Sequence, residues 1–133
     1  LKTGGKVLTI LPTGQDPLIT SFNFVKASGE FPCLRDFKPL IDYSKFDDLP
    51  ALIAKIPFKN AKVDVFTHSV PLPSLDIFRK FVNGLPFFQG QVPDEQIPII
   101  NEALVKAFEL ECKKKYYGKY QFNASIYVVT AEK

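Results

Sequence analysis

The segment VPDEQIPIINEALVKAFELECKKKYYGKYQFNASIYVVT, residues 92–130, combines the clearest helix pattern of the chain with its clearest strand pattern. From Ile97 to Cys112, apolar residues recur at three- and four-residue spacing, and charged residues occupy the opposite side. Such a stripe predicts an amphipathic helix that buries one face. We expect Asp94 to cap this helix and Gly118 to end it.

The strand pattern follows the helix directly. From Tyr120 to Val129, apolar and polar residues alternate, and aromatic and β-branched side chains are frequent. This period of two predicts a strand with one face in a core. Helix and strand together are too apolar on one side to stand alone, so the preceding residues must cover them.

The rest of the chain adds short elements separated by prolines. Two apolar runs, at Val7–Leu11 and Leu18–Ala27, are expected to form an antiparallel hairpin. A further strand is expected at Lys62–Val70, and short helices at Leu49–Ile56 and Pro73–Val82. This order predicts an α+β fold. Its sheet is antiparallel or mixed with about four strands, and two short helices and one long C-terminal amphipathic helix pack on one face.

Length and composition indicate a soluble globular protein. We expect residues 1–133 to form one compact domain with a flexible lead-in at residues 1–5. The net charge of +3 is too small to indicate a nucleic-acid partner, and no apolar run is long enough to span a membrane. The sequence contains no Met, which suggests a processed chain or one trimmed from a longer precursor. Secretion and a cytoplasmic location both stay open.

Two cysteines and one glycosylation motif bear on that question. Cys33 and Cys112 would close a long loop as a disulfide, but either can also be a free thiol. Asn123-Ala124-Ser125 matches the acceptor pattern for N-glycosylation. Neither feature decides the compartment.

The sequence offers little for catalysis or metal binding. The single histidine, His68, falls on a predicted strand face with Asp64 and would need Cys33 or Ser69 within reach to act as a base. A hydrolase that uses His68 is therefore the weakest alternative. Asp47-Asp48 is interpreted as a helix cap, and the spacing of potential ligands predicts neither a metal site nor a cofactor.

The chain contains 13 Phe but no Trp. Two of these rings are adjacent, in a loop with a polar and Gly/Pro context, where both are expected to be exposed. We therefore expect a non-catalytic protein–protein interaction domain that binds another protein through a sheet edge and this aromatic loop. The expected partner-binding residues are Phe87, Phe88, Gln89 and Gln91.

The alternative is a carrier for a small hydrophobic ligand. Phe22 and Phe24 would share one face of the predicted strand at Leu18–Ala27, and Phe78 and Phe81 would face them from a short helix. These four rings would line an apolar cavity between sheet and helices.

Overall fold

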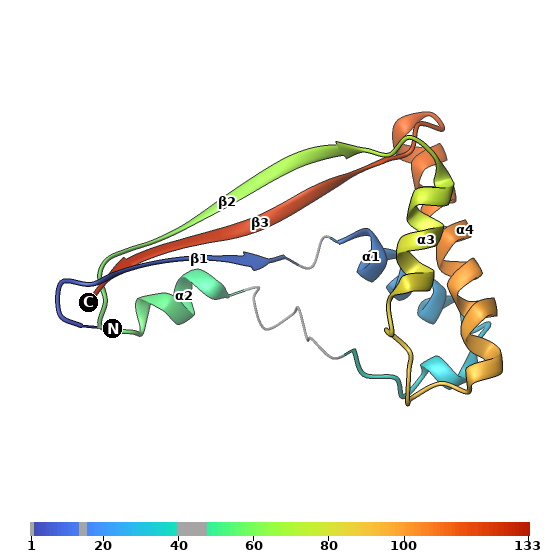
Figure 1. Ribbon diagram of the computed structural model, residues 1–133, viewed down its shortest axis with the longest axis horizontal. Coiled ribbons are helices and arrows are strands. Elements are labelled where there is room, and N and C mark those ends of the chain that lie inside the picture. Colours follow the sequence, from blue (N-terminus) through green and yellow to red (C-terminus); the bar gives the residue numbers. More distant parts are fainter. Residues whose placement is uncertain (1, 14–15, 40–47) are drawn as a thin grey trace. The chain divides into compact units, whose positions relative to one another are not determined.

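The computed structural model describes residues 2–13, 16–39 and 48–133 and has an α+β fold. Its residues group into two compact units, drawn in Figure 1. The sheet unit comprises residues 2–13, 16, 48–68 and 123–133. The helical unit comprises residues 17–39 and 69–122. The expectation of a single domain over residues 1–133 stays a prediction, and each unit is described by itself.

The sheet unit is built on three strands and a short helix. The strands are β1 (Lys6–Pro12), β2 (Lys59–Pro71) and β3 (Gln121–Glu132), and the helix is α2 (Leu49–Ala54). The last residues of β2 and the first of β3 belong to the helical unit. β3 is the central strand, so the sheet order is β1-β3-β2 (Figure 1). The described residues thus form one strand fewer than the four expected.

The predicted N-terminal hairpin is wrong because β1 pairs with the C-terminal strand. β1 and β3 run antiparallel, with Lys6 opposite Glu132 and Pro12 opposite Ile126. The lead-in joins the same ladder, because the Gly4 N–H donates to the carbonyl oxygen of Lys133 at 3.0 Å. A long-range pairing of this kind leaves no local turn signal in the sequence.

The predicted strand at Leu18–Ala27 is wrong as well: the segment is the helix α1 (Pro17–Ser28). Pro17 suits a first helical position because its missing N–H needs no partner there. Leu18, Phe22 and Val25 then fall at four- and three-residue spacing and are buried. Burial of this helical stripe decided the structure over the local alternation of apolar residues.

The helical unit packs α1 and α3 (Leu75–Gly84) against α4 (Ile97–Tyr116). Two short 3₁₀ segments, η1 (Pro32–Leu34) and η3 (Asp94–Gln96), complete it. Phe78 stacks on Phe108 with a centroid distance of 4.2 Å, which ties α3 to α4. The core cluster of this unit consists of Leu18, Phe22, Val25, Leu34, Phe37, Phe78, Val82, Phe88, Val92, Ile100, Leu104, Val105, Phe108 and Cys112.

The long amphipathic helix α4 confirms the strongest sequence pattern, with two differences at its start. Asp94 lies in η3, and the N-cap position is Gln96, which makes no side-chain capping bond. At the other end Tyr117 has a left-handed backbone, and the Gly118 N–H donates to the carbonyl oxygen of Cys112 at 3.2 Å. A positive φ at both Tyr117 and Gly118 terminates the helix there.

Candidate functional site

Among the helices and strands that the structure describes, β2 has the largest share of exposed residues. β2 has 13 residues and lies at one edge of the three-stranded sheet. Its side chains are exposed without interruption from Val65 to Ser69. An edge strand presents backbone N–H and C=O groups to which a further strand can bond. β2 therefore offers a long stretch of available backbone.

The pairing of β2 with β3 fixes which side chains share a face. Asn60 donates to the Glu132 carboxylate at 3.2 Å, and the Thr67 and Ser125 hydroxyls lie 3.3 Å apart. Both contacts fit one antiparallel register: Thr67 follows Asn60 by seven residues on β2, and Ser125 precedes Glu132 by seven residues on β3. Thr67 therefore lies on the Ser125 face, and its neighbour Phe66 lies on the opposite face.

The face that holds Phe66 is open. On β1 the same face carries Leu8 and Ile10, which lie opposite Thr130 and Val128 of β3. Leu8 is 67% exposed, Ile10 59% and Phe66 56%. The other face holds Val129 and Ala131, which are buried. This other face is thus covered at β3, whereas the Phe66 face presents apolar side chains.

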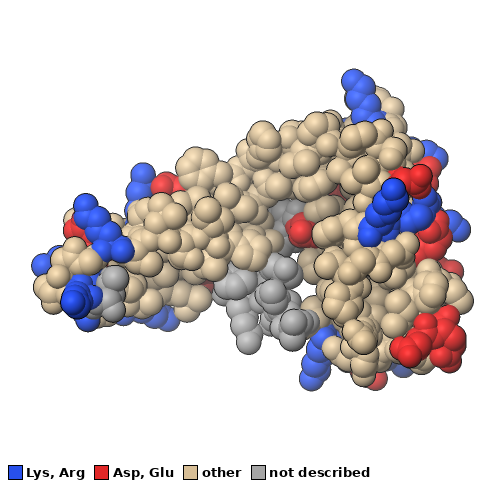
Figure 2. Space-filling view, viewed as in Figure 1, with Lys and Arg blue, Asp and Glu red and all other residues tan. Residues whose placement is uncertain are grey.

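Charged groups on β2 are confined to its first half. The Lys62 ammonium lies 3.4 Å from the Asp64 carboxylate, and both are on the Phe66 face. In the view of Figure 2, Lys and Arg of the sheet unit gather near the end that holds the termini, and the middle of the unit is uncharged. The stretch from Val65 to Ser69 therefore carries no full charge while His68 is neutral.

His68 is exposed on β2. Among the described residues its ring makes no hydrogen bond and no ion pair. The Cys33 thiol donates instead to the Gln96 side-chain carbonyl at 3.1 Å. Within residues 2–13, 16–39 and 48–133, neither a carboxylate nor a nucleophile is hydrogen-bonded to the ring, so this geometry adds no support to the alternative of a hydrolase that uses His68. Asp47 lies outside the described residues, and Asp48 occupies the N-cap position of α2 without a side-chain bond.

The expectation that both rings of the aromatic loop are exposed is wrong for Phe88. Its side chain is 2% exposed and packs with Phe22 and Phe37 in the core of the helical unit. Phe87 is half-buried against the same rings. Both rings are covered because Phe22 of α1 and Phe37, which follows η1, pack against each of them.

The polar residues of that loop have different environments. Gln91 accepts a bond from the Lys38 N–H at 3.0 Å and donates to the Lys38 carbonyl oxygen at 2.9 Å, so its amide holds the segment after η1. Gln89 is exposed. A partner-binding role for these residues stays a prediction.

The four rings expected around a ligand cavity do not share one environment. Phe22 and Phe78 are buried in the core, whereas Phe24 and Phe81 are exposed by about half. Phe22 and Phe24 point differently because α1 is a helix, on which residues two apart lie on different sides. Of the four, Phe24 lines a groove.

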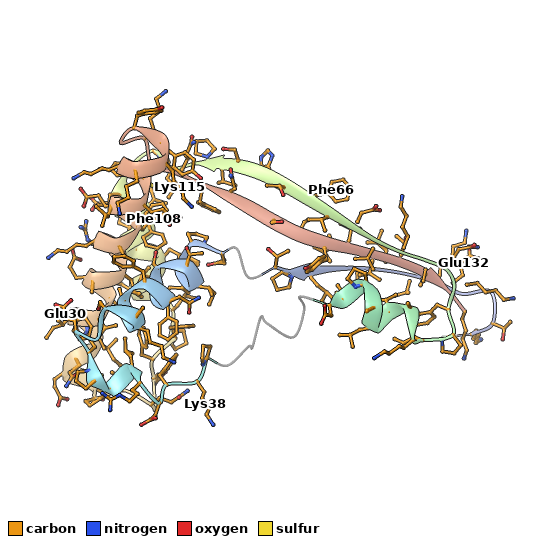
Figure 3. All side chains as sticks on the ribbon, turned by 180° about the vertical axis from the view of Figure 1, so that it is seen from behind. Glu30, Lys38, Phe66, Phe108, Lys115 and Glu132 are labelled. Atoms are coloured by element: carbon orange, nitrogen blue, oxygen red, sulfur yellow. The ribbon has the colours of Figure 1, made fainter. Side chains whose placement is uncertain are left out.

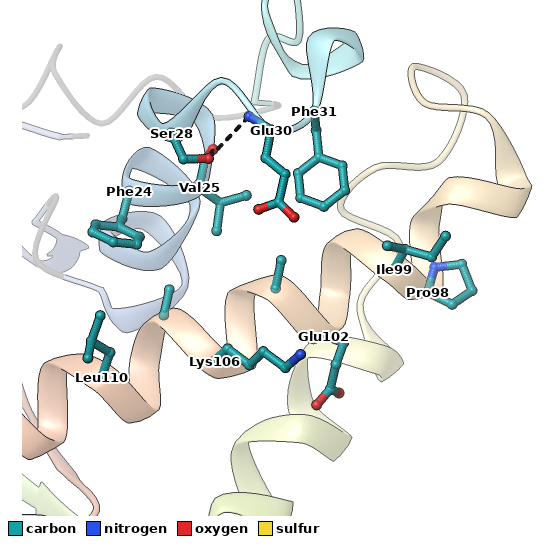
Figure 4. A pocket seen from close by; sticks show the side chains of 12 residues that line it. Phe24, Val25, Ser28, Glu30, Phe31, Pro98, Ile99, Glu102, Lys106 and Leu110 are labelled. Carbon is teal, nitrogen blue, oxygen red and sulfur yellow. Dashed lines mark hydrogen bonds between the residues drawn. The ribbon is translucent and has the colours of Figure 1, made fainter.

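This groove lies between α1 and α4 and has a volume of about 580 Å³ (Figure 4). Its floor on α4 is low because Ala103 and Ala107 carry only methyl groups there. Phe24, Ile99 and Leu110 border it with exposed apolar surface. The sequence contains the signal for this feature, two alanines at four-residue spacing, but not the helix that faces them, since α1 was expected to be a strand.

The charges at this groove are partly neutralised. Arg79 of α3 donates to both Glu102 carboxylate oxygens, at 3.1 and 3.2 Å, and also to Asp76. The hydrogen bond to Glu102 raises the pKa of Arg79 above its ordinary value. Glu30 is in no such ion pair with the described residues, and Figure 4 shows its carboxylate directed into the groove. The groove is therefore largely apolar, and Glu30 and Lys106 are among the charged residues that line it.

Both cysteines are free thiols in the helical unit. Cys33 bonds Gln96 just before α4, and Cys112 lies near the end of α4, about 24 Å further along a straight helix. A disulfide needs Cα atoms within about 7 Å, so the fold keeps the two thiols apart. Burial raises the pKa of the Cys112 thiol above its ordinary value. Asn123 of the glycosylation motif is exposed on β3.

Within residues 2–13, 16–39 and 48–133, acidic, histidine and cysteine side chains form no cluster of three that could hold a metal ion. In the same residues, no helix combines the length and the apolar character needed to cross a membrane. Comparison with protein-family models and with curated proteins gave no match for this chain.

Proposed function

We propose that the chain is a non-catalytic protein-interaction domain that binds an extended segment of another polypeptide along the outer edge of β2. The observation that supports this most is the exposure of β2: it is a 13-residue edge strand, and its side chains are exposed at ten of those positions. A partner strand would bond to its free backbone groups and extend the sheet by one strand.

Edge strands that take no partner are usually protected. Proline, inward-pointing charges, bulges or short length keep neighbouring chains from pairing with them. In β2 the only proline is Pro71, its last residue, and the lysines Lys59 and Lys62 lie in its first half. The segment from Val65 to Ser69 has none of these protections, so it is the part of the edge best suited to a partner.

Side chains on both faces would give the binding selectivity. Phe66 projects from the open face and Val65 from the other, and both are more than half exposed. A partner strand lies about 4.8 Å beyond β2, so its side chains would pack beside these two. We expect partners with apolar residues at alternate positions.

A peptide-display library selected on the immobilised chain tests this function. We expect extended peptides with alternating apolar residues, and we expect Phe66→Lys to weaken their binding about fivefold. Leu8→Lys is the matched control. It makes the same change on the same face, but β1 lies two strands away from β2, about 10 Å across the sheet. Peptides that bind both variants equally well would argue against the β2 edge.

A second candidate function is a carrier for a small apolar ligand, and the groove between α1 and α4 supports it. Its volume of about 580 Å³ falls in the range of small-molecule sites, about 300–1,000 Å³. Ala107→Phe should fill the floor and abolish binding of an apolar fluorescent dye, whereas Ala27→Phe, at an exposed position on α1, should leave binding unchanged. Equal binding by both variants would exclude this groove as the dye site.

A further inference from the structure

We infer that the partner strand at β2 is β2 of a second copy of this chain, so that two sheets join into one six-stranded sheet about a two-fold axis. This inference rests on the proposed function, because it uses the same edge. A two-fold axis perpendicular to a sheet pairs two identical strands antiparallel and makes the interface self-complementary. The charges and the apolar side chains of β2 show which copy-to-copy register is favourable.

Directly opposite residues of two paired strands share a face, and the axis keeps every residue on its own face. One residue of β2 must therefore lie opposite the same residue of the other copy, with the axis passing between the two. An axis at Val65 would place the Phe66 ring opposite the Asp64 carboxylate of the other copy. An axis at Phe66 instead places each Phe66 ring opposite the other, in the middle of the exposed run from Val65 to Ser69. Cross-strand aromatic pairs stabilise antiparallel sheets, so the axis at Phe66 is the favoured one.

The neighbouring pairs are also compatible with this register. Each residue before Phe66 faces the residue the same number of steps after it in the other copy. Asp64 then lies opposite His68, and Val65 lies opposite Thr67. Lys62 faces Val70, so lysine never lies opposite lysine. Charge in the first half of β2 and its absence from the second half therefore make the strand complementary to an antiparallel copy of itself.

A continuous sheet would also remove the exposed edge that the single chain presents. The covered face, with Val129 and Ala131, and the open face, with Leu8 and Ile10, would each continue from one copy to the next, because a perpendicular axis keeps both faces on the same side. After pairing, both outer edges of the assembly would be β1, which has seven residues and ends in Pro12. A short edge that carries a proline invites further strand addition less than β2 does.

Sedimentation velocity over about a hundredfold range of concentration tests this inference, since a dimer of this kind dissociates on dilution. We expect a monomer–dimer equilibrium for the wild type, and a dissociation constant at least about tenfold higher for Phe66→Lys, because the two introduced charges face each other. Phe66→Glu should be weakened in the same way. An equimolar mixture of the two variants should recover dimers, because opposite charges then meet at the axis. Leu8→Lys should associate like the wild type.

Thermal unfolding followed by circular dichroism establishes that each variant is folded, as expected for a position that is 56% exposed. A wild type that stays monomeric, or a mixture that does not recover dimers, would overturn the two-fold pairing. If library peptides still bind in a Phe66-dependent way, the proposed function survives that result and only the second copy is excluded. If neither self-association nor peptide binding depends on Phe66, both proposals are wrong.

Discussion

The helical unit and the sheet unit bury their apolar side chains to very different degrees. In the helical unit, Leu34, Ile100 and Leu104 are 0% exposed and belong to one continuous core cluster. Among the described residues of the sheet unit, the buried apolar side chains are Leu49, Val129 and Ala131. Figure 3 labels one ring of each kind, Phe108 inside the helical unit and Phe66 on the surface of β2.

The units differ in the size of their buried cores, although the described residues of the helical unit also expose apolar side chains, among them Phe24, Phe81 and Ile99. A compact domain normally covers its larger apolar side chains, and a contiguous group that stays uncovered marks an interaction surface. The exposed ones of the sheet unit are Leu8, Ile10, Leu52, Ile56, Val65 and Phe66. We therefore expect the stability of the chain to depend mainly on the helical unit, and the proposed binding to use the sheet unit, a division that substitutions can test.

The largest loss of stability is expected from Phe108→Ala. The ring is 1% exposed and stacks on Phe78, so its removal leaves a cavity between α3 and α4. We expect the free energy of unfolding to fall by about 3–5 kcal/mol, as measured by urea denaturation. A loss below about 1 kcal/mol would contradict the tight core described for the helical unit.

Val129→Ala makes the corresponding change in the sheet unit. Val129 is 3% exposed, on the covered face of the central strand. The substitution removes two carbon atoms, and we expect a loss of about 2 kcal/mol in the same denaturation experiment. A loss as large as that of Phe108→Ala would show that the sheet unit has a larger core than its burial indicates.

Cys112→Ala is expected to change the pH dependence of stability. Burial raises the pKa of this thiol in the folded chain above that of the unfolded thiol, about 8.5. The folded state therefore keeps its proton where the unfolded state loses it, and stability falls as pH rises above about 8.5. This part of the decline should be absent from the alanine variant. The free energies of unfolding of the two proteins, measured by denaturation, should therefore converge between about pH 8 and pH 10.

Reactivity offers a matched check within the helical unit. Cys112 is 0% exposed, whereas Cys33 is only half-buried. Iodoacetamide should modify Cys33 in the folded chain and reach Cys112 only after unfolding, as followed by intact mass. Equal labelling of both thiols would show that the end of α4 opens readily.

The smallest effect on stability is expected from Leu8→Ala. The side chain is 67% exposed on β1, and its truncation should change the free energy of unfolding by no more than about 0.5 kcal/mol. A loss above about 1 kcal/mol would show that another part of the chain covers the open face in solution, and the binding role of the sheet unit would then need revision.

Sequence patterns predicted the α+β class and several elements correctly. The amphipathic stripe of α4 and the alternation in β3 are strong because each spans several turns or pairs of residues. The segment of α1 failed because Phe22 and Phe24 alternate with polar residues, which is typical of a strand over a short window. Only the packing of Leu18, Phe22 and Val25 against other helices favours a helix over a strand in this segment, and this packing is a tertiary effect.

The candidate site was predictable only in part. The strand at Lys62–Val70 was expected from its composition, and a sheet edge was expected as the binding surface. That β2 lies at an edge depends on β3 pairing with both β1 and β2, and such long-range order has no local signal. The aromatic loop was misjudged for the same reason, because the rings that bury Phe88 come from segments more than 50 residues away.

Amide hydrogen exchange with a peptide selected from the library tests the central claim, that β2 is the binding edge, most directly. We expect the peptide to slow exchange at residues 59–68, because free N–H groups of the edge strand become bonded, while β1 exchanges as before. Slowed exchange confined to α1 and α4, with no change in β2, would contradict the account and place binding in the groove instead.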